Sequence, residues 1–196
     1  MCGRYFYDLD SEELQELCRK IQERHKQEKE LAERIASGEV YPSNYVVTLA
    51  STPREQILPG LTRWGFDGFK KGQLIINARS ETVEEKKTFK KPFQENRCIF
   101  PMSGFNEWDQ EKRKFYFSTD QTIFVAGFYR LHNSSEGRRA ESIILTTRPN
   151  GSVRNIHDRM PLIVNRKDID KWILDIDFAR HLINTDMPEL LSEQVS

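Results

Sequence analysis

The 196-residue sequence lacks several features that mark common classes of protein. It contains only three cysteines and no Cys-x-x-Cys pair, so neither a disulfide framework nor a structural zinc site is predicted, and we expect no metal or other cofactor. This cysteine usage is typical of a reducing compartment. Residues 1–30 hold no apolar signal region, and no apolar run approaches the length of a membrane span. We therefore expect a cytoplasmic protein that does not enter a membrane.

An excess of one charge is also missing. The 30 Lys and Arg residues balance the 30 Asp and Glu residues, so the net charge is zero. This balance argues against a protein that coats nucleic acid through bulk charge, although it allows a local basic groove. The length suits one domain over residues 1–196, and no linker, repeat or low-complexity segment divides the chain. Because no long apolar stripe is left for a partner, we expect a monomer.

The hydrophobic pattern changes once along the chain. Residues 2–7 are typical of a first strand, and a helix is predicted from Asp10 or Ser11 to Ala36, with Glu13 in capping-box position. From Val40 onward, short apolar segments alternate with turn residues, which predicts strands at 45–50, 74–77, 97–100, 114–118, 122–129, 141–147 and 161–164. Further helices are predicted at 80–87, 167–174 and 178–184. This pattern indicates an α+β fold with a curled or barrel-like, mostly antiparallel sheet and peripheral helices.

The most informative residue is Cys2. Initiator methionine is normally removed before a small residue, which would make Cys2 the N-terminus, with a thiol and an α-amine on one residue. These two groups can attack one aldehyde carbon in turn and close a five-membered thiazolidine ring. The reference pKa of an α-amine is about 7.7 against about 10.4 for Lys, so its neutral fraction at pH 7 is larger by roughly 500-fold. The alternative is that position 2 accepts any small residue and that Cys2 is incidental.

Four polar clusters are set in apolar sequence near predicted strand ends, where a rigid scaffold commonly holds functional side chains. Each has a structural explanation when taken alone: Asn77 satisfies a turn, Glu107 and Arg79 form a buried pair, and His157 lies at the edge of the core. Together with Cys2 they supply a nucleophile, an acid–base carboxyl, a histidine and an amide, which a carbonyl-condensing site needs. The clusters are Arg63-Trp64-Gly65, Asn77-Ala78-Arg79-Ser80-Glu81, Gly104-Phe105-Asn106-Glu107-Trp108 and His157-Asp158-Arg159-Met160-Pro161.

Five blocks, MCGRY, RWG, INARSE, CIFPMSGFNEW and HDRMPLIV, occur in the order found in the SOS-response-associated peptidase (SRAP) family. The sequence resembles that family over nearly its whole length. The resemblance implies that Cys2 is the nucleophile that crosslinks to the ring-opened aldehyde of an abasic site in single-stranded DNA. It implies that Asn77 orients the cysteine and the opened sugar, that Glu107 handles protons during ring opening and Schiff-base formation, and that His157 assists proton transfer.

The same resemblance implies phosphate contacts from Arg4 and Arg79. Single-stranded DNA binding also needs backbone charge and an aromatic platform, for which Arg63, Lys86 and Lys87, and Trp64 and Phe69, are the candidates. Pro42 is a further candidate for the DNA groove. A tryptophan among apolar residues is also typical of a core, so both interpretations of Trp64 stay open. The chain departs from the family pattern at Glu39, where Asn is frequent, at Asn106, where Tyr is frequent, and at residues 66–69, where a Pro-x-Trp segment is frequent.

Two other functions fit the same residues. In a cysteine peptidase, Cys2, His157 and Asn77 would act as nucleophile, base and orienting group, and removal of Met1 would be the mildest such activity. In a non-catalytic nucleic-acid-binding module, Cys2 would have no chemical role. The substrate discriminates between them, because abasic DNA gives an SDS-stable adduct only with the crosslinking protein, whereas a peptidase turns over peptides.

Overall fold

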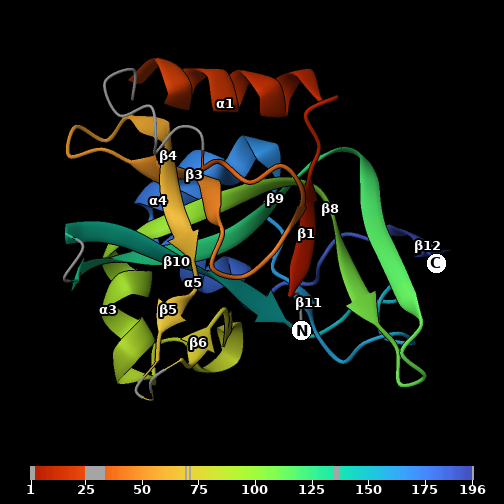
Figure 1. The fold of residues 1–196 in the computed structure, drawn as a ribbon. Coiled ribbons are helices and arrows are strands. Elements are labelled where there is room, and N and C mark those ends of the chain that lie inside the picture. The colour runs from red at the N-terminus through yellow and green to blue at the C-terminus, as the bar shows by residue number, and fades with distance from the viewer. Residues whose placement is uncertain (1–2, 25–33, 69, 71, 135–136, 196) are drawn as a thin grey trace.

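The computed structural model describes residues 3–24, 34–68, 70, 72–134 and 137–195 (Figure 1). Cys2 and Phe69 lie outside the described residues. Helices surround a strongly curved sheet, as Figure 1 shows, and the predicted α+β class with a barrel-like sheet is confirmed. Among the described residues, no helix is both long enough and apolar enough to cross a membrane.

The centre of the fold is a closed barrel of five strands. The ladder order is β9-β10-β4-β3-β8, and β8 pairs back onto β9 to close the ring. All of these ladders are antiparallel except the short one between β4 and β10. The barrel strands are β3 (Tyr45–Ser51), β4 (Ile57–Trp64), β8 (Arg97–Trp108), β9 (Lys114–Ser134) and β10 (Gly137–Thr147).

Short strands extend the barrel where the functional motifs lie. β1 pairs with the end of β8, and β2 pairs with the outer side of β1. β7 and β11 both pair with β10, β12 pairs with β9, and β5 and β6 form a separate small hairpin. Their bounds are β1 (Arg4–Tyr7), β2 (Gly38–Val40), β5 (Phe66–Asp67), β6 (Leu74–Ile75), β7 (Asn77–Arg79), β11 (Met160–Pro161) and β12 (Leu191–Val195).

The helices cover the barrel with one apolar side each. On α1, which crosses the top of Figure 1, Leu14, Cys18 and Ile21 are buried at the three-to-four-residue spacing of an amphipathic helix. Buried Arg97 donates to the carbonyls of Trp172 and Ile173, and so fastens the C-terminal helices to the barrel. The helices are α1 (Glu12–Arg24), α3 (Lys87–Glu95), α4 (Ile169–Leu174) and α5 (Ile176–Leu182), with 3₁₀ turns η1 (Ser80–Thr82) and η2 (Arg166–Asp168).

Several expected elements differ from the structure: the strand expected at 161–164 is only the two-residue β11, and the strand expected at 74–77 is divided between β6 and β7. The helix predicted to reach Ala36 does not, because Ile35 forms a β-bridge with Tyr45; residues 25–33 lie outside the described chain. The helix predicted at 80–87 is the 3₁₀ turn η1, and α3 starts only at Lys87. Strand β4 was not expected from the sequence, and it contains Pro59. The proline is tolerated because β10 pairs only with Arg63 and Trp64 of β4, which leaves Pro59 without a ladder partner on that side.

Candidate active site

Strand register brings the beginning of the chain to the end of β8. In the antiparallel ladder between β1 and β8, Arg4 lies opposite Asn106 and Tyr5 opposite Phe105. Gly3 precedes Arg4 and Glu107 follows Asn106, so the chain before β1 runs toward Glu107. Gly3 is the first described residue, and the predicted nucleophile Cys2 is joined to it directly.

Glu107 is a buried carboxyl near the end of β8. Glu107 is only 2% exposed. Burial raises the pKa of its carboxyl to about 7, because the ionised form loses hydration there. Its Oε2 lies 3.8 Å from Nε2 of His157, which comes from the loop before β11. At neutral pH this carboxyl is therefore partly protonated, which suits a group that both donates and accepts a proton.

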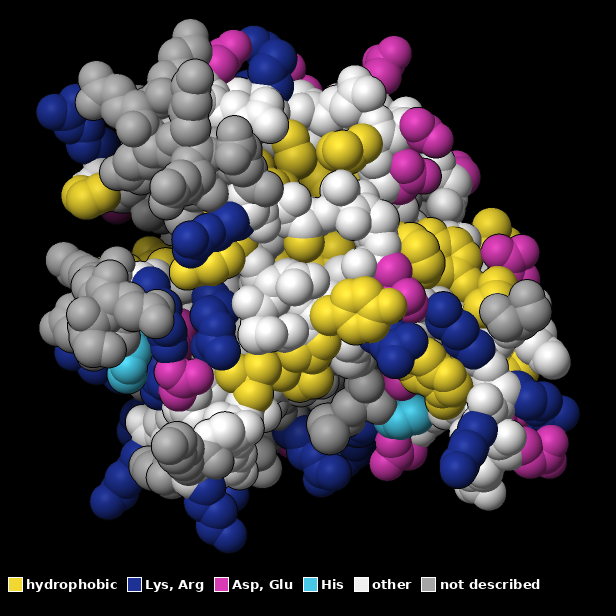
Figure 2. Space-filling model, viewed as in Figure 1, with side chains coloured by type: hydrophobic (Ala, Val, Ile, Leu, Met, Phe, Trp, Pro, Cys, Tyr) yellow, Lys and Arg dark blue, Asp and Glu magenta, His cyan; other side chains and the backbone are white. Residues whose placement is uncertain are grey.

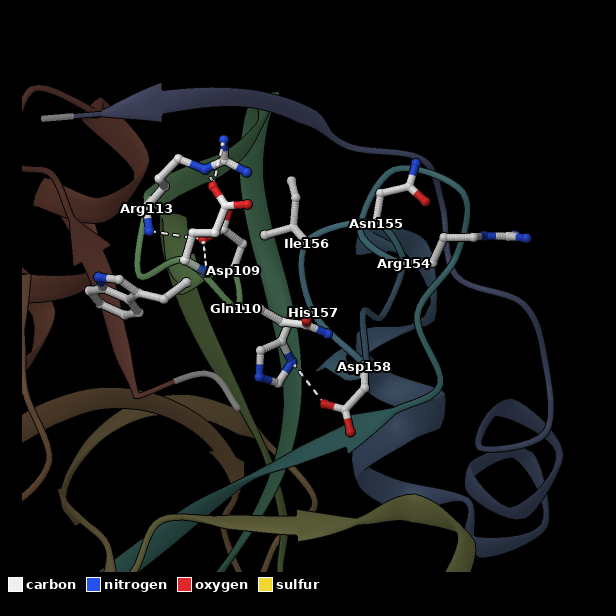
Figure 3. Close-up of a pocket in the computed structure, with 10 residues that line it drawn as sticks. Asp109, Gln110, Arg113, Arg154, Asn155, Ile156, His157 and Asp158 are labelled. Carbon is white, nitrogen blue, oxygen red and sulfur yellow. Dashed lines mark hydrogen bonds and ion pairs between the residues drawn. The ribbon is translucent and has the colours of Figure 1, made fainter.

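The ring of His157 is held by the backbone that follows it. Its Nδ1 lies 3.0 Å from the backbone nitrogen of Arg159 and 3.2 Å from the carbonyl oxygen of the same residue, and its Nε2 faces Glu107. Desolvation lowers the pKa of His157 and favours the neutral ring. Asp158 lies 3.2 Å from Nδ1, as the dashed line in Figure 3 marks, and can pair with this nitrogen when the ring is protonated.

Glu107 and His157 thus have opposite pKa shifts. Burial raises the pKa of the carboxyl and lowers the pKa of the imidazole. The usual gap between the two pKa values therefore closes, and the carboxyl no longer has to lose its proton before the imidazole does. Groups whose environments move their pKa values in this way are typical of acid–base sites. A proton at this site can reside on the carboxyl while the imidazole stays neutral.

Two other predicted motifs meet on β10. Asn77 and Arg79 lie on β7, where Arg79 pairs with Thr146. Thr146 also pairs with Pro161 of β11, which directly follows the His157 loop. The guanidinium of buried Arg159 donates to both carboxylate oxygens of Glu81, at 2.6 and 2.8 Å, and so links η1 to that loop. Arg79 is exposed, so the alternative in which Arg79 and Glu107 form a buried pair is wrong.

Aromatic and cationic side chains cover the surface next to Glu107 and His157. The guanidinium carbon of Arg4 lies 5.0 Å from the ring centroids of both Tyr41 and Trp108. Figure 2 shows hydrophobic side chains intermixed with Lys and Arg on this face, beside a histidine. Since bases stack on exposed aromatic rings and phosphates pair with cations, such a surface suits a single-stranded nucleic acid.

An open pocket of about 670 Å³ adjoins His157. It lies between the turn that joins β8 to β9 and the loop before β11, and Figure 3 shows side chains from both segments around it. Arg113 pairs with Asp109 in its wall. The lining residues are Trp108, Asp109, Gln110, Glu111, Arg113, Arg154, Asn155, Ile156, His157 and Asp158.

The remaining predicted DNA contacts fall into three groups. Trp64 is fully buried, packs 5.2 Å from Tyr5 and donates its indole N–H to the Ile76 carbonyl, so its prediction as a stacking platform is wrong and it belongs to the core. Arg63 is paired with Asp67 and Glu141, which neutralise its charge. Lys86 and Lys87 are exposed at the start of α3, and Pro42 lies in the turn between β2 and β3.

One group of side chains has metal-ligand chemistry. Ligand atoms of Asp67, His132 and Glu141 lie within 4.8 Å of one another. Arg130 and Arg139 contact Glu141 at 2.8 and 2.9 Å, and Arg139 also pairs with Asp67. Guanidinium groups that occupy both carboxylates repel a cation, so we interpret this cluster as an ion-pair network that ties β5 to β9 and β10.

Comparison with known proteins decides the family. The model for SOS response associated peptidase (SRAP) matches residues 1–194. The chain belongs to the SRAP family. Abasic site processing protein YoqW of Bacillus subtilis is 32% identical over 177 residues, which are 82% of this chain and 79% of the relative. YobE of the same organism, also named an abasic site processing protein, is 31% identical over 163 residues, 75% of this chain and 74% of the relative.

Solved structures share the SRAP fold of this chain. A protein from Bacteroides thetaiotaomicron superposes with a TM-score of 0.76 at 22% identity, over all of this chain and 92% of that protein. One from Bordetella bronchiseptica gives 0.74 at 18% identity over the full length of both chains. At these identities the likeness concerns the fold alone.

Sequence reasoning missed several residues around the SRAP site. Three side chains gather around Arg4: Glu39 and Tyr41 contact it directly, and Lys114 pairs with Glu39. Of these, only Glu39 was named from the sequence, as a departure from the family pattern. They come from β2, the turn after it and β9, so only the strand register reveals that they meet. The Glu81–Arg159 pair joins two motifs that were recognised separately.

Proposed function

We propose that this SRAP protein processes abasic sites in single-stranded DNA, and that it does so by a covalent thiazolidine crosslink between Cys2 and the ring-opened sugar. The observation that carries the proposal is the buried Glu107, which lies 3.8 Å from His157 at the strand end toward which the chain before β1 runs. The names of the relatives as abasic site processing proteins support the same substrate.

The proposal requires Cys2 to reach this pair, and the covalent link to Gly3 allows it. Consecutive Cα atoms lie about 3.8 Å apart, so Cys2 is one peptide unit away from Gly3. Loss of Met1 exposes the α-amine on the same residue as the thiol, so one short tether serves both nucleophiles.

The crosslink forms in two additions with a net loss of one water. The α-amine adds to the aldehyde carbon, and the resulting carbinolamine loses water to give an imine. Protonated Glu107 donates a proton to the departing hydroxyl. The thiol then adds to the imine carbon, its proton passes to the nitrogen, and the five-membered ring closes. Neutral His157, whose Nε2 faces Glu107, exchanges protons with that carboxyl, and Asn77 orients the opened sugar.

The surface beside the site gives the nucleic acid its path. Arg4, between the Tyr41 and Trp108 rings, and exposed Arg79 contact phosphates, and Lys86 and Lys87 extend the charge along α3. Loss of one phosphate contact lowers the slope of log affinity against log salt by about 0.7 on a single strand. This local charge compensates for the zero net charge of the chain.

The direct test is to mix the purified protein with a single strand that contains one abasic site. We expect a product that survives SDS, with an intact mass equal to protein without Met1 plus DNA minus one water. The same strand without the lesion serves as the control and should give no product. Peptide turnover without any DNA adduct would establish the peptidase alternative instead, and reversible binding alone would establish a non-catalytic module.

His157→Ala is expected to slow adduct formation more than it weakens DNA binding. Because desolvation lowers the pKa of His157, the wild-type rate should contain a component that titrates below the ordinary imidazole value of about 6.5, and the variant should lack it. Single-turnover rates measured from about pH 5 to 8 check this expectation. His181→Ala, at an exposed position on α5, is the matched control. Superimposable profiles for His157→Ala and wild type would make His157 a packing residue.

A further inference from the structure

Glu39, on the edge strand β2, is surrounded by four polar side chains from other positions in the fold. Its carboxylate accepts from Lys114 Nζ at 3.0 Å and from Asn106 Nδ2 at 3.1 Å. The hydroxyl of Tyr41 donates to its other oxygen, and the guanidinium of Arg4 lies 3.7 Å away. Ammonium, amide, phenol and guanidinium groups thus converge on one anion, which is the arrangement that also binds a phosphate.

The two cations in this group belong to the surface that the proposed function assigns to DNA. Both lie over the ring of Trp108, whose centroid is 5.0 Å from the guanidinium carbon of Arg4 and 6.0 Å from Lys114 Nζ. The Arg4 side chain is 42% exposed, so a ligand can reach it. One carboxylate against two cations leaves the group with a single net positive charge.

We propose that Glu39 is an internal substitute for a DNA phosphate, which competes with the backbone of a single strand for Arg4 and Lys114 and so weakens binding to undamaged DNA. This inference rests on the proposed function. The carboxylate is ionised at neutral pH, because the hydrogen bond from Tyr41 and the charges of Lys114 and Arg4 hold the pKa of Glu39 below its ordinary range. A strand that takes up the two cations must displace this anion or lie beside it.

Competition of this kind suits a protein that ends its search with a covalent bond. The crosslink supplies the residence time at the lesion, so tight reversible binding elsewhere would only hold the protein on intact strands. An anion built into the groove lowers affinity for every sequence equally, since phosphates carry no sequence information. Glu39 therefore limits the time that the protein spends bound to intact strands.

The test compares Glu39→Gln with wild type in equilibrium binding to an intact single strand over a range of salt. Glutamine keeps the shape and can still accept from Lys114 and Asn106, but it carries no charge. Removal of one like charge about 4 to 5 Å from a phosphate should tighten binding by about 5-fold or more. The slope of log affinity against log salt should steepen by up to about 0.7. Intact strand should also inhibit the crosslinking of abasic DNA at correspondingly lower concentration.

Two further variants control for charge and for shape. Glu12→Gln makes the same charge change at an exposed position at the start of α1, past the opposite end of β1 from Arg4, and should leave affinity unchanged (Figure 1). Glu39→Asp keeps the carboxylate and should stay close to wild type.

The outcomes separate this inference from the function on which it rests. If wild type crosslinks abasic DNA but Glu39→Gln binds intact DNA equally or more weakly, then Glu39 orients Arg4 and does not compete, and this inference alone fails. If wild type neither binds nor crosslinks single strands, the proposed function fails and the inference fails with it. An equal gain in Glu12→Gln would reduce the effect to net charge and would also overturn the role of Glu39.

Discussion

Replacement of Cys2 by alanine is expected to reduce the SDS-resistant adduct with abasic single-stranded DNA to background. Alanine keeps the α-amine, so an imine can still form, but no thiol is present to close the ring. The imine hydrolyses reversibly, and it should be trapped only when a reductant such as borohydride is added. Denaturing gels with and without the reductant, on the same samples, measure the two species.

The other two cysteines provide matched controls. Cys98 is fully buried and Cys18 is 8% exposed, and burial raises the pKa of both thiols. Neither thiol can replace a reactive thiolate at the surface. Cys18→Ala should therefore retain the wild-type adduct. Stable adduct from Cys2→Ala at the wild-type level, without reductant, would overturn the thiazolidine mechanism.

The sequence predicted the strands that carry the site because these segments are apolar, bounded by turn residues, and buried in the barrel. The expected segment at 45–50 is β3, and those at 97–100 and 141–147 lie within β8 and β10. The predicted strands at 114–118 and 122–129 are one continuous strand, β9, because Asp120 and Gln121 keep extended backbone at the barrel surface. The ladder with β8 shifts register there and continues on either side.

Side-chain partners could not be predicted from the sequence in the same way. Trp64 and Trp108 both sit in short polar motifs, yet Trp64 is fully buried and Trp108 packs over Arg4. The difference comes from the register of strands that are far apart in sequence. The same is true of Glu39, which meets Lys114 across 75 positions of sequence. No local pattern encodes such a contact, so the charge of the surface around Arg4 became clear only from the folded chain.

Glu107→Gln is expected to slow crosslinking by about 10² to 10⁴-fold, the usual contribution of a general acid–base group, with little change in binding to unreacted DNA. Glutamine preserves the size of the side chain but cannot donate a proton to the departing hydroxyl. Single-turnover adduct formation and equilibrium binding, measured on the same preparation, separate the two effects. Glu12→Gln, at the exposed start of α1, removes a carboxylate away from the site and should react like wild type.

The pH dependence of the Glu107→Gln variant gives a second, independent readout. The wild-type rate should rise with pH as the α-amine loses its proton, with a reference pKa of about 7.7, and should be held back above pH 7 as Glu107 ionises. The rate of Glu107→Gln should lack this second effect and keep rising with pH.

The free energy of unfolding depends on the same carboxyl. The pKa of Glu107 is about 7 in the folded protein and exceeds the ordinary value of 4.5, so the unfolded chain releases this proton at lower pH. Wild type should therefore lose stability between about pH 4.5 and 7, by roughly 3 kcal/mol at most, whereas Glu107→Gln should not. A variant that loses rate and DNA binding equally, and whose melting temperature falls at pH 6 and pH 8 alike, would instead show that Glu107 holds the fold and does not move the proton.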